Sequence, residues 1–356
     1  MNIMRTFTIS AVVALGAAAC STATTTDETT SASPTTTASP MPTKVTVVTH
    51  DSFAVPDDVL AAFEAGSGLD VTFVAPGDAG TLVNQLVLTK DAPLGDVVYG
   101  VDNTFASRAI EAGVFADYTS DAPAATDAAA YAIDGSQALT AIDFSDVCLN
   151  IDLAAFGGDL PAPRTFDNLL DPAYSGMVSV TNPATSSPGL AFLMATIAAK
   201  GDTWPDYWAA LRDNGLRVTA SWSDTYYTDF SAPNYGGDYP IVLSYASSPP
   251  FEAVDGQPTT AALLDTCFRQ VEYAGVLAGA QNPQGAQQVV DWMLSDDFQA
   301  SVPENMYVYP VSTAVTVPAE WAQYAPLAAD PWSIDPATID AKRDEWIQTW
   351  TDTVLN

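Results

Sequence analysis

The sequence predicts an α/β protein built as two lobes, on three observations. Three strand-then-helix units follow one another from Lys44, and a second series of such units begins at Met177. The length of 356 residues suggests two domains rather than one. Hydrophobic residues make up 48% of the chain, which is enough to bury a sizeable core.

The first series begins with the alternating run KVTVVT, which predicts a strand. A helix is expected over residues 56–65, with two acids in its first turn and Gly66 at its end. Further strands are expected at 71–75 and 96–101, followed by helices at 81–90 and 104–112. Consecutive units of this kind predict a parallel sheet with right-handed crossovers.

The second series places strands at residues 177–180, 216–220 and 240–244 and helices at 189–199 and 204–212. Two more helices are expected near 284–294 and over 336–355. We therefore expect lobe 1 at 44–145, with about 268–310 returning to it, and lobe 2 at 146–267. The C-terminal helix, within about 311–356, is expected to pack on lobe 2.

The N-terminus predicts export. Residues 1–19 have a basic start and an apolar stretch about half as long as a bilayer needs, which indicates a signal peptide. Three alanines directly before Cys20 resemble a bacterial lipobox, which implies a lipid on that sulfur and attachment to the outer face of the cell membrane. The alternative is an ordinary signal peptide with Cys20 incidental. Residues 20–43 form a Ser/Thr/Pro-rich tether with almost nothing to bury.

Charge and motif content exclude several function classes. The chain has 43 acidic residues, 11 Lys and Arg and one histidine, giving a net charge of −32 that repels the phosphates of nucleic acids. It has neither a P-loop nor a GxGxxG after a strand, and one histidine leaves no His-rich metal site. We expect a monomeric protein that is not an enzyme and has no cofactor or metal site.

Two further cysteines, Cys148 and Cys267, lie in apolar, strand-like runs. In an exported protein such a pair predicts a disulfide. Two buried free thiols are the alternative. Neither cysteine has a histidine or basic residue directly beside it in the sequence, so we expect a structural role in both cases.

The loops that follow the predicted strands hold the candidate ligand residues, because open α/β sheets bind ligands at the carboxyl ends of their strands. An acid follows each of three strands in lobe 1, and aromatic rings follow strands in lobe 2 and the late segment. Carboxylates facing rings suit a flat organic cation. Each acid alone can be a helix cap and each ring a core residue, but their coincidence favours a ligand site. The residues are Asp51, Asp78, Asp102, Trp222, Tyr245, Phe251 and Tyr307.

Ser186 and Ser187 stand directly before the predicted helix that contains Gly189. Serine hydroxyls and free backbone N–H groups at a helix start can bind an anion without Lys or Arg. Simple capping of the helix is the alternative. The ligand, if bound here, is cationic at one end and has a hydroxyl or phosphate at the other.

Seven segments together resemble one family, the thiamine-binding proteins that serve bacterial ABC importers. The resemblance runs from Lys44 almost to the end, and it is the order of all seven that makes it specific. It implies a type II periplasmic-binding-protein fold, in which two lobes joined by a hinge close over thiamine or its phosphates, and an ABC permease with its ATPase as partners. The segments are THDSFA (49–54), VAPGDAG (74–80), DVVYGVDN (96–103), TNPATSSPGL (181–190), ASWSDTYY (220–227), IVLSYASSP (241–249) and PENMYVYPV (303–311).

The resemblance also implies residue roles. Asp78 and Ala79 match the family's Asp-Gly ligand pair. Ser186 and Ser187 match its Ser-Thr pair on the hydroxyethyl or phosphate end of the ligand. Trp222 matches a ligand-packing Trp, and Tyr245 and Ser248 match the Tyr and Ser of one segment.

Three ligand-wall aromatics of the family are altered in this chain. Phe251 stands at a Tyr, Tyr307 at a Trp and His50 at a Tyr. His50 is the largest departure, because an imidazole stacks less area and can become charged near pH 6.5, opposing a cation.

Other cargoes and an enzyme stay open at this point. Ferric-binding relatives use a consecutive Tyr-Tyr pair with His and carboxylate ligands, which Tyr226 and Tyr227 with His50 could imitate. A polyamine is possible on charge grounds. An exported thiamine-cleaving enzyme would need a cysteine in the cleft, and neither Cys148 nor Cys267 lies in a ligand loop.

Overall fold

The computed structural model describes residues 43–133, 136–232 and 234–356. The predicted signal peptide, Cys20 and all but the end of the tether lie outside the described residues.

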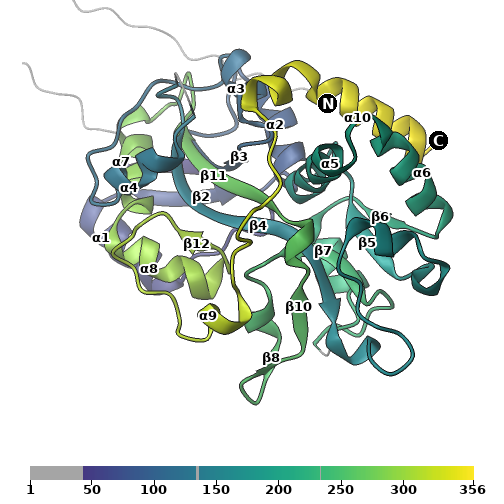
Figure 1. Ribbon diagram of the computed structural model, residues 1–356. Coiled ribbons are helices and arrows are strands. Elements are labelled where there is room, and N and C mark those ends of the chain that lie inside the picture. Colours follow the sequence, from purple (N-terminus) through teal and green to yellow (C-terminus); the bar gives the residue numbers. More distant parts are fainter. Residues whose placement is uncertain (1–42, 134–135, 233) are drawn as a thin grey trace, which may run out of the picture. The chain divides into compact units, whose positions relative to one another are not determined.

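The body is built on one mixed sheet, so the predicted α/β class is confirmed (Figure 1). The strands follow one another across it in the order β2-β1-β3-β11-β4-β7-β5-β6, with β10 and β12 also paired to β4, while β8 and β9 form a separate hairpin. The strands are β1 Lys44–Val48, β2 Asp70–Val74, β3 Val97–Asp102, β4 Thr140–Asp152, β5 Val178–Thr181, β6 Arg217–Thr219, β7 Ile241–Tyr245, β8 Ala253–Val254, β9 Gln257–Pro258, β10 Thr260–Ala262, β11 Phe268–Val276 and β12 Tyr309–Pro310.

The two series of parallel strands form the two ends of this sheet. β1 pairs in parallel with β2 and β3, and β5 pairs in parallel with β6 and β7, as the strand-then-helix pattern predicts. Between them lie β4 and β11, which are antiparallel to each other, and β4 continues into pairing with β7. The parallel pairing predicted for the consecutive strand-then-helix units is therefore confirmed at both ends, whereas the centre of the sheet is antiparallel. Here two long strands, seen in the sequence only as strand-like runs around the cysteines, join the two halves.

Helices cover the sheet, and their ends follow local capping. Gly68 ends α1 with a left-handed φ of 73° and an N–H bond to Glu64, two residues beyond the predicted end at Gly66. The Asp78 side chain accepts from the Ala79 N–H and so starts α2 two residues earlier than predicted. The α-helices are α1 Asp57–Ser67, α2 Ala79–Leu88, α3 Ala106–Glu111, α4 Ala125–Ala128, α5 Ser187–Lys200, α6 Trp204–Asp213, α7 Pro283–Met293, α8 Asp296–Asn305, α9 Trp321–Tyr324 and α10 Pro336–Val354.

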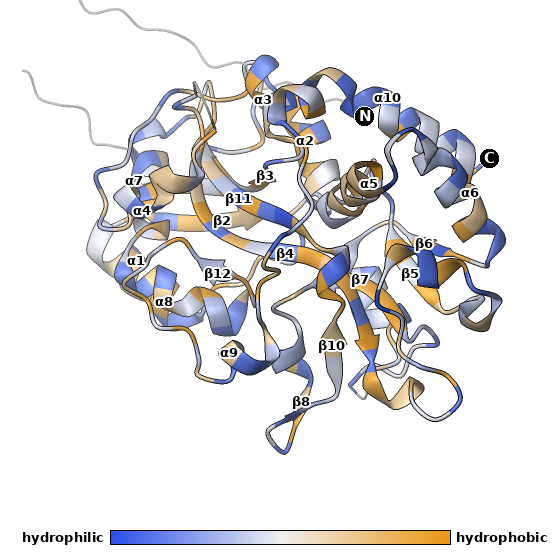
Figure 2. Cartoon of the chain, viewed as in Figure 1, coloured by the Kyte–Doolittle hydropathy of each residue, from blue (hydrophilic) through white to orange (hydrophobic). Residues whose placement is uncertain are grey.

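The core gathers around the sheet and α5, whose first ten residues are all buried. By contrast, α10 buries one stripe, including Trp346 and Trp350, and turns hydrophilic residues outward (Figure 2). Trp350 packs edge-on against Trp208 of α6, with ring centres 5.5 Å apart. The same helix reaches α3, where Arg343 donates to the Ser107 hydroxyl at 2.9 Å. In the part of the chain that is described, no helix has the length and apolar composition needed to cross a membrane.

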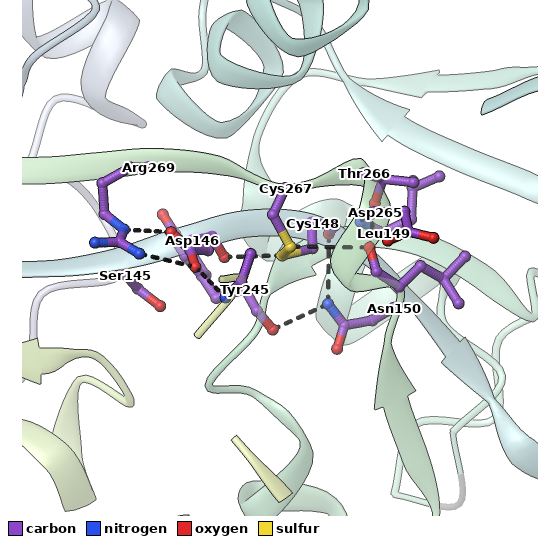
Figure 3. Close-up of a disulfide and its surroundings, with 12 residues drawn as sticks. Ser145, Asp146, Cys148, Leu149, Asn150, Tyr245, Asp265, Thr266, Cys267 and Arg269 are labelled. Atoms are coloured by element: carbon purple, nitrogen blue, oxygen red, sulfur yellow. Dashed lines mark hydrogen bonds and ion pairs between the residues drawn. A yellow bond between two sulfur atoms is a disulfide. The ribbon is translucent and has the colours of Figure 1, made fainter. Parts of the chain in front are cut away.

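A disulfide joins Cys148 on β4 to Cys267, the residue directly before β11, with Cα atoms 4.3 Å apart (Figure 3). Both residues are fully buried. Next to it, Arg269 of β11 forms an ion pair with the buried Asp146 of β4. The two strands that join the halves of the sheet are therefore linked covalently and electrostatically at the same level.

Candidate functional site

A pocket lies where the carboxyl ends of β1 and β7 meet the residues that follow α8. Its volume of about 90 Å³ is well below the roughly 300–1,000 Å³ of most small-molecule pockets, so a ligand of that size needs the walls to move apart. None of the described residues that line it is Lys or Arg. The lining residues are His50, Ser52, Trp222, Tyr226, Tyr227, Tyr245, Ser248, Phe251, Glu272, Asn305, Met306, Tyr307 and Val308.

His50 enters the pocket because β3 gives it room. β3 has an irregular register against β11 at Gly100, which has a φ of 95°. A Cβ on Gly100 would lie 2.2 Å from Cδ2 of His50, so only glycine fits here. The imidazole is 6% exposed, and its Nδ1 is 3.1 Å from the Ser52 hydroxyl.

Glu272 of β11 faces His50 across the pocket floor. Its Oε1 is 3.3 Å from Nε2 of His50, and both side chains are almost fully buried. A register shift directly after Glu272 disturbs the pairing of β11 with β4, as bulges next to functional sites often do. Behind the pair, the Tyr99 hydroxyl donates to Asp143 at 2.6 Å and to Glu272 at 3.1 Å.

The charges of this floor are strongly coupled. Burial by itself lowers the pKa of His50, but the charge and hydrogen bond of Glu272, with Asp78 and Asp51 nearby, raise that pKa above 6.5. Burial raises the pKa of Glu272, but its ion pair with His50 brings that pKa below the usual value. Burial and the charge of Glu272 hold the pKa of Asp143 well above the usual range, so this carboxyl keeps its proton. The floor therefore presents one carboxylate, on Glu272, paired to a titratable imidazole.

Aromatic rings form the walls. Trp222 stacks on Tyr226, with ring centres 5.0 Å apart and planes 16° from parallel, and Tyr227 meets Trp222 edge-on. Phe251 and Tyr307, which also line the pocket, form an edge-on pair with ring centres 4.8 Å apart. Tyr307 has a φ of 51°, a conformation that a bulky residue adopts only when its surroundings impose it.

Ser248 holds the Trp222 wall in place. Its hydroxyl lies 2.8 Å from that of Ser244, which accepts the Trp222 indole N–H at 2.9 Å. The Tyr245 N–H also reaches the Ser248 hydroxyl, at 3.3 Å. Since Tyr226 and Tyr227 belong to a π-helical segment, Asp224–Asp229, this wall carries a local distortion of the kind often found at functional sites.

Asp78 and Ala79 lie beside the pocket and do not line it. The Asp78 carboxylate caps α2 through the Ala79 N–H at 2.6 Å and accepts the Trp222 N–H at 2.8 Å. The Thr81 N–H donates to the Thr185 carbonyl at 3.0 Å. The start of α2 therefore touches the segments that carry Thr185 and Trp222.

Asp102, Ser186 and Ser187 are also buried, near the contact between the start of α2 and Thr185. Asp102 starts the turn into α3 by accepting from Thr104 and Phe105, and burial raises its pKa to about 6. The Ser187 hydroxyl faces Asp102 and the Ser186 hydroxyl faces Asp78, in neither case with a short, well-aligned hydrogen bond. In this structure the two serines thus face carboxylates rather than open space.

Six predicted ligand residues line the pocket, while Asp51, Asp78, Ala79, Asp102, Ser186 and Ser187 do not. Asp51 is exposed and adjacent to His50. Of the lining residues that sequence reasoning missed, Glu272 is the most important, and its signal was a lone acid in an otherwise apolar half-strand, VEYAGV. The six that line the pocket are His50, Trp222, Tyr245, Ser248, Phe251 and Tyr307.

The arrangement suits binding of a flat organic cation rather than catalysis. Rings supply apolar area and cation–π attraction, and Glu272 supplies a counter-charge. Cys148 and Cys267 are joined in the disulfide and do not line the pocket, which removes the nucleophile that a thiamine-cleaving enzyme would need. Among the described residues, no three His, Cys, Asp or Glu side chains form a group that could hold a metal ion.

Comparisons with known proteins agree with this geometry. Residues 92–332, more than half of the chain, match the family described as bacterial extracellular solute-binding protein. The chain is 29% identical over 313 residues to the thiamine-binding periplasmic protein of Escherichia coli K12, covering 86% of this chain and 92% of that protein. It is 26% identical to the protein of the same name from Brucella melitensis, with 86% and 91% covered.

Solved structures give the same fold. A periplasmic thiamin-binding protein superposes with a TM-score of 0.77 at 29% identity, covering 89% of this chain and 98% of that one. Iron-bound HitA from Pseudomonas aeruginosa superposes with a TM-score of 0.69 at 20% identity, covering 88% and 99%, which supports the fold alone. The predicted periplasmic-binding-protein fold is confirmed, and the iron-binding proteins are the more distant relatives.

Proposed function

From the premise that the chain belongs to the bacterial extracellular solute-binding proteins, we propose that its solute is thiamine, free or phosphorylated, delivered to an ABC permease and its ATPase. The family match confirms the expectation of a binding protein that works outside the cytoplasm and is not an enzyme. The choice of thiamine rests on one observation above all. Glu272 and several aromatic rings line the same pocket, and relatives that match 86% of this chain are named thiamine-binding periplasmic proteins.

Thiamine is a fixed thiazolium cation joined to an aminopyrimidine, so it offers a charge and two flat rings. In this proposal the Trp222–Tyr226 stack and the Phe251–Tyr307 pair contact the rings, and Glu272 balances the charge. Ser186 and Ser187 would approach the hydroxyethyl or phosphate end when the ligand separates them from Asp78 and Asp102.

Ligand entry requires the two lobes to part, because the pocket is too small for a molecule of this size as it stands. The lobes we propose are 44–145 with about 268–310, and 146–267. β4 and β11 join them and supply the hinge. The contact of Asp78 with Trp222 and of Thr81 with Thr185 would then belong to the closed form.

Calorimetric titration of the purified protein tests the proposal. Thiamine, thiamine monophosphate, thiamine diphosphate, spermidine and ferric citrate are titrated in turn into the same protein. Saturable 1:1 heat with thiamine or its phosphates and none with spermidine or ferric citrate is the expected result. Preferential binding of ferric citrate, with visible tyrosinate–iron absorption, would replace thiamine by iron.

Membrane attachment is a separate part of the proposal. A lipid on Cys20 would hold the body outside the membrane on the Ser/Thr/Pro-rich segment of residues 21–43. Cys20→Ser is expected to move the protein from the membrane fraction to the medium or soluble fraction. Retention in the membrane fraction would refute lipidation at this cysteine.

A further inference from the structure

The pocket floor contains a titratable partner for Glu272, the imidazole of His50. Nε2 of His50 is 3.3 Å from Oε1 of Glu272, and both side chains are almost fully buried. We propose that a cationic ligand takes the place of the imidazolium proton as the partner of Glu272, so that binding exchanges one proton for the cargo. This inference rests on the proposed function, since it takes thiamine as the cation.

The groups around His50 leave room for only one buried positive charge. Glu272 faces it from β11 and Tyr99 from β3, with the Tyr99 hydroxyl bonded to Asp143 of β4. On the other sides lie Asp78 at the start of α2, Asp51 next in sequence, and the Ser52 hydroxyl at 3.1 Å from Nδ1. None of the described lining residues is Lys or Arg, so His50 is the pocket's own candidate counter-charge.

Two like charges in a buried pocket repel, whereas one charge next to Glu272 is compensated. A thiazolium entering the pocket therefore makes the imidazolium less favourable and promotes loss of its proton. The pKa of His50 is raised above 6.5 by Glu272, so this exchange is expected above the usual imidazole range. Glu272, whose pKa is below its usual value, stays ionised throughout.

The sign of the effect follows from linkage. Because binding releases a proton, affinity for the cation increases as pH rises and levels off above the pKa of His50 in the empty protein. The increase is at most about tenfold per pH unit, the limit for release of one proton. A neutral side chain at position 50 would remove the contribution of the imidazole to this dependence.

The experiment uses the fact that His50 is the only histidine in the chain. In the untagged protein its Cε1–H NMR signal is the single imidazole resonance, and its titration is followed from pH 5.5 to 9 without and with saturating thiamine. We expect a midpoint above 6.5 without ligand and a shift to lower pH with thiamine. Calorimetry at pH 7 in two buffers of different ionisation enthalpy counts the protons released per thiamine bound.

Three variants test whether the His50 midpoint depends on the ion pair with Glu272 or only on the net charge of the protein. Glu272→Gln is expected to lower the midpoint of the free protein, because the imidazolium loses its partner. Glu345→Gln, an exposed position on α10, changes the net charge equally and is expected to leave the midpoint unchanged. His50→Gln is expected to remove the share of proton release that follows the titration of the imidazole, so that fewer protons are released per thiamine bound than in the wild type at pH 7.

The possible outcomes test the proton exchange and the proposed thiamine binding separately. Thiamine binding with an unshifted His50 midpoint and no proton release would overturn the exchange and leave the proposed function intact. Absence of thiamine binding over the whole pH range would overturn both. The wild-type measurement needs no substitution, so a variant that fails to fold does not decide the result.

Discussion

At the scale of single residues, Trp222 is held in position by contacts that do not depend on a ligand. Its backbone N–H donates to Asp78, its indole N–H donates to Ser244, and its ring stacks on Tyr226. A ring fixed at both ends loses little conformational entropy on binding. It is therefore the residue whose removal should report most directly on ligand stacking.

Trp222→Ala is expected to weaken thiamine binding by about 1–3 kcal/mol, because stacking and cation–π attraction are lost together. Isothermal calorimetry measures the change. Trp332→Ala is the matched control, since Trp332 is a half-exposed tryptophan outside the pocket, and we expect its affinity to equal that of the wild type. Equal affinity for Trp222→Ala would remove this residue from the site.

Some residues of the site could be predicted from the sequence and others could not. Aromatic residues after strands could be assigned to one site because parallel strands end at a common edge. The partner of His50 could not be predicted from the sequence. Glu272 is 222 positions away, in an antiparallel strand whose register shifts at that residue. Such a pairing depends on tertiary register, which local patterns do not encode. Without knowledge of Glu272, the sequence therefore suggested only that a charged His50 would oppose binding of a cation.

At the scale of elements, the start of α2 packs closely against the loop before α5. A Cβ on Gly80 would come within 2.6 Å of the Thr185 carbonyl carbon. Only the backbone of glycine permits this approach, because real Cβ atoms do not come so near to backbone. Because this contact joins segments of the two proposed lobes, it belongs to the closed form in the proposed mechanism.

Gly80→Ala is therefore expected to weaken thiamine binding by about 1–3 kcal/mol, the usual cost of overpacking, by disfavouring the closed form. Calorimetry gives the affinity, and small-angle scattering with saturating thiamine reports whether the protein still contracts. Gly66→Ala in α1, where an added Cβ meets nothing within 4 Å, is the control and should bind as the wild type does. A Gly80→Ala protein with wild-type affinity would show that this contact does not limit closure.

The elements that sequence patterns predicted least well are the central strands β4 and β11. Helices and outer strands have sharp ends set by neighbours in sequence, such as Gly68 and Asp78, and their predicted bounds differ from the structure by only a few residues. β4 runs for 13 residues and pairs with β11 in its first half and β7 in its second. A strand buried on both sides has no alternating pattern, so its length and direction are set by partners far away in sequence.

The disulfide between these central strands closes a loop of 119 residues. The double variant Cys148→Ser/Cys267→Ser is expected to lose about 2–5 kcal/mol of unfolding free energy, mainly because the unfolded chain regains freedom. Urea unfolding followed by circular dichroism measures the loss. In wild-type protein, a reductant without urea should leave the fully buried bond intact. Rapid reduction of the folded protein, or equal stability of the variant, would contradict the expectation.

At the scale of the whole molecule, a net charge of −32 is combined with carboxyl groups buried near the pocket. Burial raises the pKa values of Asp78 and Asp102 and, with the charge of Glu272, that of Asp143, while the net effect on His50 is also a rise. In each case the folded protein holds its proton at a pH where the unfolded chain has released it. Ionisation therefore weakens the fold, and self-repulsion of the acidic surface acts in the same direction.

The free energy of unfolding is accordingly expected to fall as pH rises from 5 to 8. Asp102 contributes between its unfolded pKa of 3.8 and its folded value of about 6, and the share above pH 5 is about 1–2 kcal/mol. His50 adds to the fall above 6.5, where the unfolded chain has lost its proton and the folded protein loses it in turn. Urea denaturation at half-unit pH steps, in ligand-free protein at constant ionic strength, gives the curve. Asp102→Asn keeps an acceptor for Thr104 and Phe105 but cannot ionise, so its curve should be flatter between pH 5 and 6.5. A wild-type stability that increases over this range, or an Asp102→Asn curve parallel to it, would show that the buried carboxyl does not govern the acid side of the profile.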